Sequence, residues 1–252
     1  DPLSASIGIG VTNLMFTFVG LWLIDRLGRR TLLYIGSVGY IISLGICAFA
    51  FLTYPGFRVV SSAIDVENSA KQMISMQEPD SVLSETDKKN IMEDYKQSQE
   101  KLIVATSREK YAGEKVLIPE DAAPEKIAEI ATTAKIEASG LLGSKKYVVL
   151  FSIMAFIAAH AVGQGAVIWV FISEIFPNRN RAAGQALGSF THWIFAATIT
   201  LVFPLAIGTF DAGMIFAFFC AMMCLQLIWV KLMVPETKGV PLEEIQKELG
   251  IK

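Results

Sequence analysis

The chain has 252 residues, of which 53% are hydrophobic and 18% are charged, whereas soluble domains usually carry about 25% charged residues. Its mean hydropathy is +0.48, and its formal net charge of −2 gives no basic excess that would indicate a nucleic-acid partner. Residues 55–146 contain 29 of the 46 charged side chains. This uneven distribution excludes an ordinary soluble domain and predicts an all-α membrane protein that carries one polar insert.

Five apolar runs are long enough to cross a bilayer, which needs about 20 residues at a rise of about 1.5 Å each. In chain order they cover residues 3–24, 31–54, 147–176, 182–207 and 212–234. Burying such helices in a large soluble protein would require far more amphipathic chain. We therefore expect two spans (1–54), an insert (55–146), three further spans (147–234) and a tail (235–252).

The positive charges of the short loops predict the orientation, because such loops stay in the cytoplasm. Arg26, Arg29 and Arg30 follow the first span, and Arg179 and Arg181 follow the third, whereas the loop GTFD after the fourth span has no positive charge. The lysines of the last span and tail are Lys231, Lys238, Lys247 and Lys252. These loops and the tail are expected inside a cell (inner) membrane and the insert outside. Five spans hardly enclose a solute path, and the start DPLSAS lacks Met, so upstream helices are expected.

The insert contains two helix signals. Ser84, three residues before Asp87, is expected to cap a helix over about residues 88–105, and Pro124 is expected to open one that stops at Gly140. The first would carry an apolar stripe made of Ile91, Tyr95, Leu102 and Ala105. A small extracytoplasmic helical cap and a loosely ordered loop both fit this composition.

The sequence contains no pattern typical of an enzyme or of a cofactor site. Cys47, Cys220 and Cys224 lie in apolar runs, and His160 and His192 lie on different spans without neighbouring carboxylates. A disulfide framework, a metal site and hydrolytic catalysis are therefore not expected.

Polar side chains inside the spans are more informative, because an unpaired polar group in hydrocarbon is costly. Measured from the cytoplasmic span ends, Asn13, His192 and Trp169 lie about 18, 16 and 10 Å deep. Amide, imidazole and indole groups suit a neutral polyhydroxylated solute, with hydrogen bonds for hydroxyls and an aromatic face for C–H bonds. Hydrogen bonding between helices is the alternative reading.

Three motifs stand at span boundaries: DRLGRR at residues 25–30, WVFISEIFPNRNRAAGQALG at 169–188, and PETKG at 235–239. Together they resemble the C-terminal half of a sugar porter of the major facilitator superfamily, from its eighth span onward, similar to bacterial xylose/glucose–proton symporters. The resemblance implies part of a twelve-helix, alternating-access fold that works with missing N-terminal helices and membrane lipid. It also implies a monosaccharide substrate, with the particular sugar left open.

The resemblance also assigns residues to the sugar. Asn13 falls at the family's sugar-contacting asparagine, Trp169 at the tryptophan that packs on the sugar, and Gly165 at the glycine four residues earlier. Trp193 matches a second tryptophan, and His192 stands where the family usually has Gln or Asn.

This sequence departs from the family at two further places. Ala166 and Ile168 replace prolines that ease helix breakage in the family, so local gating is expected to differ. The long insert is also unusual.

Charged residues gather at the cytoplasmic span ends: Asp25, Arg29, Arg30, Glu174, Arg181 and Glu236. Unlike charges there are expected to pair when the inside is closed and to separate when it opens, as exposed pairs worth about 0–1 kcal/mol can do. Setting the topology alone is the alternative role.

Asp25, Glu174 and Glu236 all sit at span ends, so no carboxylate inside a span could carry a proton. The resemblance implies that the coupling acid of a symporter belongs to the first seven helices, so proton coupling is left open and a symporter and a facilitator are both compatible. A non-transporting sugar sensor with the same fold is the alternative function, although a long cytoplasmic tail would be expected of it. A receptor or adhesion module is disfavoured because the insert contains only three aromatic residues, Phe57, Tyr95 and Tyr111.

Overall fold

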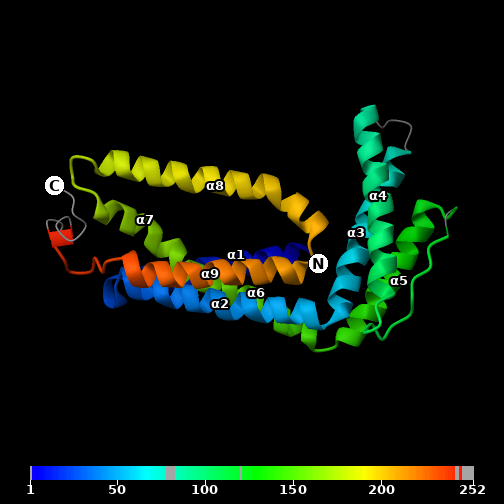
Figure 1. The fold of residues 1–252 in the computed structure, drawn as a ribbon, viewed down its shortest axis with the longest axis horizontal. Helices are drawn as coiled ribbons and strands as arrows, with labels where there is room; N and C mark the ends of the chain where they lie inside the picture. The colour runs from blue at the N-terminus through cyan, green and yellow to red at the C-terminus, as the bar shows by residue number, and fades with distance from the viewer. Residues whose placement is uncertain (1, 78–82, 120, 242–243, 246–252) are drawn as a thin grey trace. The chain divides into compact units, whose positions relative to one another are not determined.

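The structure is a computed structural model that describes residues 2–77, 83–119, 121–241 and 244–245. This part of the chain consists of α-helices and connecting segments, without a β-strand (Figure 1). Five helical segments in it are long and apolar enough to cross a membrane: Ser6–Leu27, Arg29–Thr53, Lys145–Ile175, Arg181–Ile207 and Ala212–Met233. The predicted all-α class with five spans is confirmed. Lys247 and Lys252 of the predicted tail lie outside the described residues.

The chain divides into two compact units. Residues 1–48 and 149–252 form the membrane unit, and residues 49–148 form the insert unit, with the boundaries falling inside α2 and α6. The predicted insert, residues 55–146, lies within the insert unit. The helices of the membrane unit are α1 (Pro2–Leu27), most of α2 (Arg29–Thr53) and α6 (Lys145–Val162), α7 (Gln164–Ile175), α8 (Arg181–Thr209) and α9 (Ala212–Met233).

The turn between α1 and α2 depends on Gly28. Its φ is +90°, a backbone conformation that residues with a Cβ rarely adopt. A Cβ at this position would also lie 2.5 Å from a carboxylate oxygen of Glu236. Gly28 therefore allows both the tight hairpin and the close approach of the segment after α9.

The third span, expected as one run, is broken at Gly163 into α6 and α7. A Cβ on Gly163 would lie 2.7 Å from the Cα of Gly36 in α2, so the two backbones touch at this point. Close backbone approach through glycine is a common way for membrane helices to pack. The break occurs although Ala166 and Ile168 replace the helix-breaking prolines of the family pattern.

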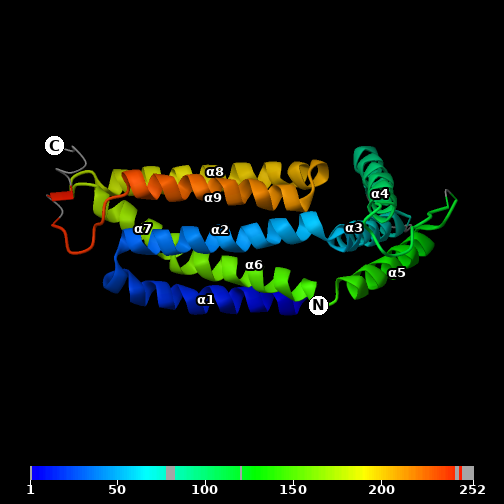
Figure 2. The ribbon, with the colours of Figure 1, turned by 60° about the horizontal axis from the view of Figure 1, so that its bottom comes forward.

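The packing of the membrane unit is uneven. Its small core includes Ile24, Leu32, Val167 and Val230, contributed by α1, α2, α7 and α9. Figures 1 and 2 show α1, α2, α6 and α9 running side by side, while Figure 1 shows α8 set apart from α9 along most of its length and meeting it at the turn that joins them. None of the residues in the most apolar 18-residue stretch of α8 is buried.

The insert unit contains α3 (Pro55–Met76), α4 (Glu85–Thr106) and α5 (Pro124–Leu142). The predicted cap of α4 is confirmed, because the backbone N–H of Asp87 donates to Ser84 Oγ at 3.1 Å. The predicted stop of α5 at Gly140 is wrong: the helix continues to Leu142 and ends at Gly143, whose φ of +52° suits glycine.

Helix α3 was not predicted from the sequence, although Pro55 at its first position is a recognised start signal. Its buried face recurs at helical spacing, at Val59, Ala63, Val66 and Ala70, which are all fully buried. In α4, Leu102 and Ala105 of the predicted stripe are fully buried and Tyr95 nearly so. The insert is therefore described as a packed three-helix unit rather than a loose loop.

Candidate functional site

A pocket of about 440 Å³ lies between α7 and α8. Trp169 and Ile172 line it from α7, and Gly188, His192 and Phe195 line it from α8. The volume falls within the roughly 300–1,000 Å³ typical of small-molecule sites, and a mostly apolar lining with few polar groups is equally typical.

Two tryptophans flank the imidazole of His192. Its ring centre lies 5.3 Å from that of Trp169, at an interplanar angle of 76°, and 5.4 Å from that of Trp193, at 78°. These edge-to-face arrangements are favourable for aromatic rings. They hold an imidazole beside a partly exposed indole, which combines a hydrogen-bonding group with a flat apolar surface.

The other predicted sugar-contacting residues lie elsewhere in the membrane unit. Gly165 packs against His160, since a Cβ on Gly165 would lie 3.0 Å from the carbonyl oxygen of His160. Asn13 is exposed on α1, where its backbone carbonyl accepts a hydrogen bond from Thr17. The structure thus brings together Trp169, His192 and Trp193. Contact of Asn13 and Gly165 with a sugar stays a prediction.

Sequence reasoning missed the polar contacts between α2 and the broken span. Tyr40 of α2 forms a hydrogen bond with His160 of α6, and Ser37 accepts one from Gln164 of α7. The available signal was the spacing of Ser37 and Tyr40 within an apolar run, because polar side chains three apart share one helix face.

Charged residues meet where α2 begins and α7 ends, and we call Asp25, Arg29, Glu174, Glu236 and Thr237 the charge cluster. The guanidinium of Arg29 binds Glu174 through two hydrogen bonds, Nη2 to Oε1 at 2.7 Å and Nε to Oε2 at 3.0 Å. The Arg29 side chain is only 12% exposed. Paired bonds of this kind are directional and stronger than bonds between neutral groups.

The segment after α9 joins the cluster through Glu236. Its carboxylate accepts the backbone N–H groups of Arg29 at 2.9 Å and Arg30 at 3.2 Å, at the start of α2. A carboxylate at this position satisfies helix N–H groups that have no partner within the helix and complements the helix dipole. Thr237, to which the sequence assigned no role beyond its place in the PETKG motif, is buried and donates from Oγ1 to Glu174 Oε2 at 2.6 Å.

The other charged residues that were predicted for the cytoplasmic gate, Asp25, Arg30 and Arg181, make different contacts. Asp25 is largely exposed and pairs with Arg29 at 3.2 Å, while the side chain of Arg30 donates to the carbonyl of Lys231 at 2.7 Å. Arg181 forms no ion pair within the described chain, and its Nε is buried without a hydrogen-bond partner there. Glu174 is therefore paired with Arg29 and not with Arg181. Among the described residues, no group of three His, Cys, Asp or Glu side chains is arranged to hold a metal.

The chain is similar to known transport proteins. The sequence profile of the family described as "Sugar (and other) transporter" matches residues 1–73 and 127–249. Solute carrier family 2, facilitated glucose transporter member 12 of Xenopus laevis is 27% identical over 250 residues, covering 98% of this chain and 42% of that protein. Member 10 of Mus musculus is 26% identical over 254 residues, covering 97% of this chain and 44% of that protein.

A third relative, probable polyol transporter 3 of Arabidopsis thaliana, is 37% identical over 101 residues, which is 40% of this chain and 20% of that protein. The chain thus spans less than half the length of the curated relatives that it matches.

Proposed function

The chain belongs to the Sugar (and other) transporter family, the sugar porters of the major facilitator superfamily, and on that premise we propose that it supplies the C-terminal helices of a monosaccharide transporter. It is a multi-pass membrane protein with part of that fold. In our proposal, upstream helices complete the solute path, and the sugar crosses by alternating access. Relatives named as glucose and polyol transporters favour a neutral, polyhydroxylated solute.

The observation that carries the proposal is the pocket between α7 and α8. Trp169, 41% exposed, leaves indole surface available for the C–H face of a sugar. His192, whose ring lies 5.3 Å from that indole, can donate or accept a hydrogen bond with a hydroxyl. Both groups are uncharged when the imidazole is neutral, as suits a neutral solute.

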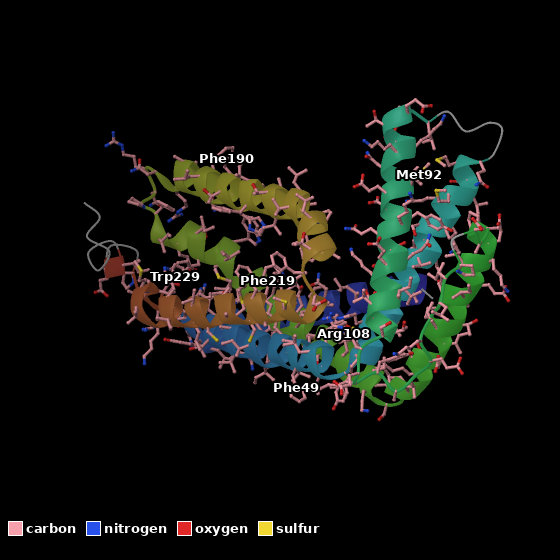
Figure 3. The ribbon with its side chains drawn as sticks, turned by 45° about the vertical axis from the view of Figure 1, so that its right-hand side comes forward. Phe49, Met92, Arg108, Phe190, Phe219 and Trp229 are labelled. Carbon is pink, nitrogen blue, oxygen red and sulfur yellow. The ribbon has the colours of Figure 1, made fainter. Side chains whose placement is uncertain are left out.

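Binding of radiolabelled D-glucose and D-xylose to the full-length protein tests this function. Trp169→Ala is expected to raise the Kd about tenfold through loss of ring contact. His192→Gln should retain binding, because an amide can also donate and accept. Trp229→Ala, on α9 (Figure 3) and outside the pocket lining, is the matched control and should change little. Loss of affinity in the control alone would contradict the assigned site.

We further propose that the charge cluster is a latch of the transport cycle. It joins the start of α2, the end of α7 and the segment after α9 through Arg29, Glu174 and Glu236. Movement of these helix ends apart would break the Arg29–Glu174 pair. Glu174→Gln should therefore slow net transport while keeping the sugar Kd within about threefold. Arg181→Ala should have the smaller effect, because Arg181 lies outside the pairing. Abolished binding in folded Glu174→Gln protein would refute the latch.

We propose that the insert lies outside the cell (inner) membrane and that the charge cluster lies inside. The loop arginines support this orientation. Leu117 is 84% exposed and suits a labelling test. In a background without Cys47, Cys220 and Cys224, Leu117→Cys should react with an impermeant maleimide in intact cells. Labelling only after lysis would reverse the orientation.

Facilitated passage is the coupling mode that we propose over proton symport. The support for this proposal is that the relatives are named as facilitated transporters. Sugar uptake should therefore equilibrate without accumulation and should be unaffected by a protonophore. Accumulation that collapses with the protonophore would show symport.

A further inference from the structure

Two membrane spans end side by side where the insert unit begins and ends. The α2 span ends at Thr53 and the third span begins at Lys145, and both ends belong to the insert unit. They lie close together, because Lys145 Nζ is 4.6 Å from the ring centre of Tyr54. We call residues 49–57 and 142–148 the insert base. Since both spans end here, the insert base lies at the edge of the bilayer.

The insert base is a packed junction. Gly143, with a φ of +52°, ends α5 and lets α6 follow after a tight turn. A Cβ on Gly56, at the start of α3, would lie 3.1 Å from the side chain of Leu142. Phe57 is 7% exposed, and its ring centre lies 5.1 Å from that of Phe51. The insert base therefore presents its exposed side chains from a closely packed framework.

Two lysines give the insert base a positive charge. Lys145 and Lys146 are exposed and form no ion pair with any residue that the structure describes. The ammonium of Lys145 lies over the ring of Tyr54, and that of Lys146 lies 5.5 Å from the ring centre of Tyr147. Cations are attracted to aromatic faces at such distances. The insert base contains these two lysines and no Asp, Glu or Arg, so its formal charge is +2.

The position of the lysines is unfavourable for the helix that carries them. They form the start of α6, whose first turn contains no acidic residue. Positive charge at a helix N-terminus opposes the helix dipole, which favours an anion there. An anion bound from outside the helix would remove this conflict.

Apolar side chains are exposed on the same insert base. Phe49, labelled in Figure 3, is 63% exposed, and Leu52, one helical turn further along α2, is 56% exposed. Tyr147 is 53% exposed, and tyrosine is enriched at the level of lipid headgroups. A free phosphate would use only the lysines, whereas a phospholipid offers a phosphate to the lysines and acyl chains to Phe49 and Leu52. The combination therefore fits a lipid.

We propose that the insert base binds an anionic phospholipid, with Lys145 and Lys146 contacting its phosphate. Tyr54 is the positioning residue that holds the ammonium of Lys145. The contact ties the insert base to the bilayer where α2 and α6 leave it. It goes beyond the proposed function, because it requires only the membrane spans and not a particular solute.

Hydrogen exchange of the amides of residues 143–148 tests this binding locally, using the full-length protein in nanodiscs. Discs of phosphatidylcholine are compared with discs in which part of that lipid is replaced by phosphatidylglycerol. The anionic lipid should slow the exchange about fivefold in the wild-type protein, since each lysine near an anionic surface contributes an attraction of that order. In the double variant Lys145→Gln with Lys146→Gln, the slowing should fall below about twofold.

Two matched double variants separate charge from other effects. Lys145→Arg with Lys146→Arg keeps both charges and should retain the slowing. Lys88→Gln with Lys126→Gln removes two exposed lysines that are ion-paired within α4 and α5. This control should behave as the wild-type protein, although its net charge equals that of the glutamine variant.

Tyr54→Leu tests the positioning role, because it removes the ring beneath the ammonium of Lys145. It should reduce the slowing by phosphatidylglycerol by about half, since a cation–π contact is weaker than the attraction of the charge itself. Tyr54→Phe keeps the ring and should restore the slowing. Exchange in phosphatidylcholine alone should be the same in all three proteins.

Four outcomes would overturn the inference. Full slowing in the folded glutamine variant would remove the lysines from the contact. Equal exchange in both lipids in the wild-type protein would show that the charge is not recognised. Slowing only in discs that hold two copies of the chain would assign this surface to a second copy. If the glutamine variant does not fold, wild-type protein at about 1 M salt decides, because the attraction should then be screened, and undiminished slowing would refute it.

Discussion

The insert unit and the membrane unit use their apolar residues in opposite ways. The insert unit is the charged part of the chain, yet Val59, Val66 and Leu102 in its core are 0% exposed. The membrane unit is the apolar part, yet Trp193 and Leu201 on α8 are 66% and 77% exposed. The charged unit therefore has a closed apolar core, whereas the most apolar stretch of α8 in the membrane unit has no buried residue.

The surrounding medium explains the difference. In water, burying apolar surface is the main force that drives helices together. In a bilayer, lipid tails are as apolar as leucine, so helices associate through close backbone contacts and polar bonds instead. Beside its small apolar core, the membrane unit has contacts of this second kind: glycine on glycine at Gly36 and Gly163, and the hydrogen bond from Gln164 to Ser37.

The family match adds a second contrast. It covers residues 1–73 and 127–249, and so includes most of α3 and α5 but not α4. Helix α4 nevertheless supplies Leu102, Ala105 and Tyr95 to the core of the insert unit. Helix α4, which lies outside the family match, thus packs against α3, most of which lies inside the match.

The largest effect is expected from Leu102→Ala in α4. This side chain is fully buried, so its truncation should destabilise the insert unit by about 2–5 kcal/mol. Val104→Ala, two residues further along and 59% exposed, is the control and should cost less than about 0.5 kcal/mol. Hydrogen exchange of the α4 amides in the full-length protein measures both. Equal protection in the two variants would show that the core is not closely packed.

A moderate, pH-dependent effect is expected from Glu67 of α3. Its carboxylate accepts hydrogen bonds from Lys135 Nζ at 2.6 Å and Thr132 Oγ1 at 2.7 Å, both on α5. Partial burial alone would raise the pKa of Glu67, but the bonds from Lys135 and Thr132 outweigh it and hold the pKa below its usual value. Glu67→Gln should therefore cost about 1–3 kcal/mol at pH 7.

The sign of the pH dependence follows from that lowered pKa. The stabilisation by Glu67 is present above the pKa of the unfolded carboxyl, about 4.3, and is lost as the pH falls through the lower pKa of the folded state. In Glu67→Gln protein, the free energy of unfolding should therefore fall less than in the wild-type protein as the pH is lowered. Glu129→Gln, which breaks an exposed pair with Lys126, is the control and should cost about 0–1 kcal/mol. An unchanged acid profile in Glu67→Gln protein would contradict the assignment.

The smallest effect is expected on α8. Leu201→Ala removes a side chain that is 77% exposed. The free energy of unfolding of the full-length protein in lipid, measured by thermal unfolding, should therefore change by less than about 0.5 kcal/mol. A cost of 2 kcal/mol or more, in the range of buried leucines, would show that this face packs against protein instead of lipid.

Composition and periodicity determined the class of this protein, because membrane spans depend on local properties. Twenty apolar residues form a spanning helix wherever the rest of the chain goes. The cap at Ser84 was also readable, since a cap involves neighbours three residues apart. The same local reasoning failed for α3, whose apolar face is diluted by charged residues and becomes evident only when α4 and α5 cover it.

The pairings between distant residues were decided by tertiary structure alone. Nothing in the local sequence shows that Glu174 meets Arg29, 145 positions away, in place of Arg181, seven positions away. Likewise, Tyr40 and His160 are 120 positions apart and meet because Gly36 and Gly163 allow α2 to touch the broken span. Local patterns specify which segments become helices, whereas the crossing of their backbones selects the polar side chains that come within hydrogen-bonding distance.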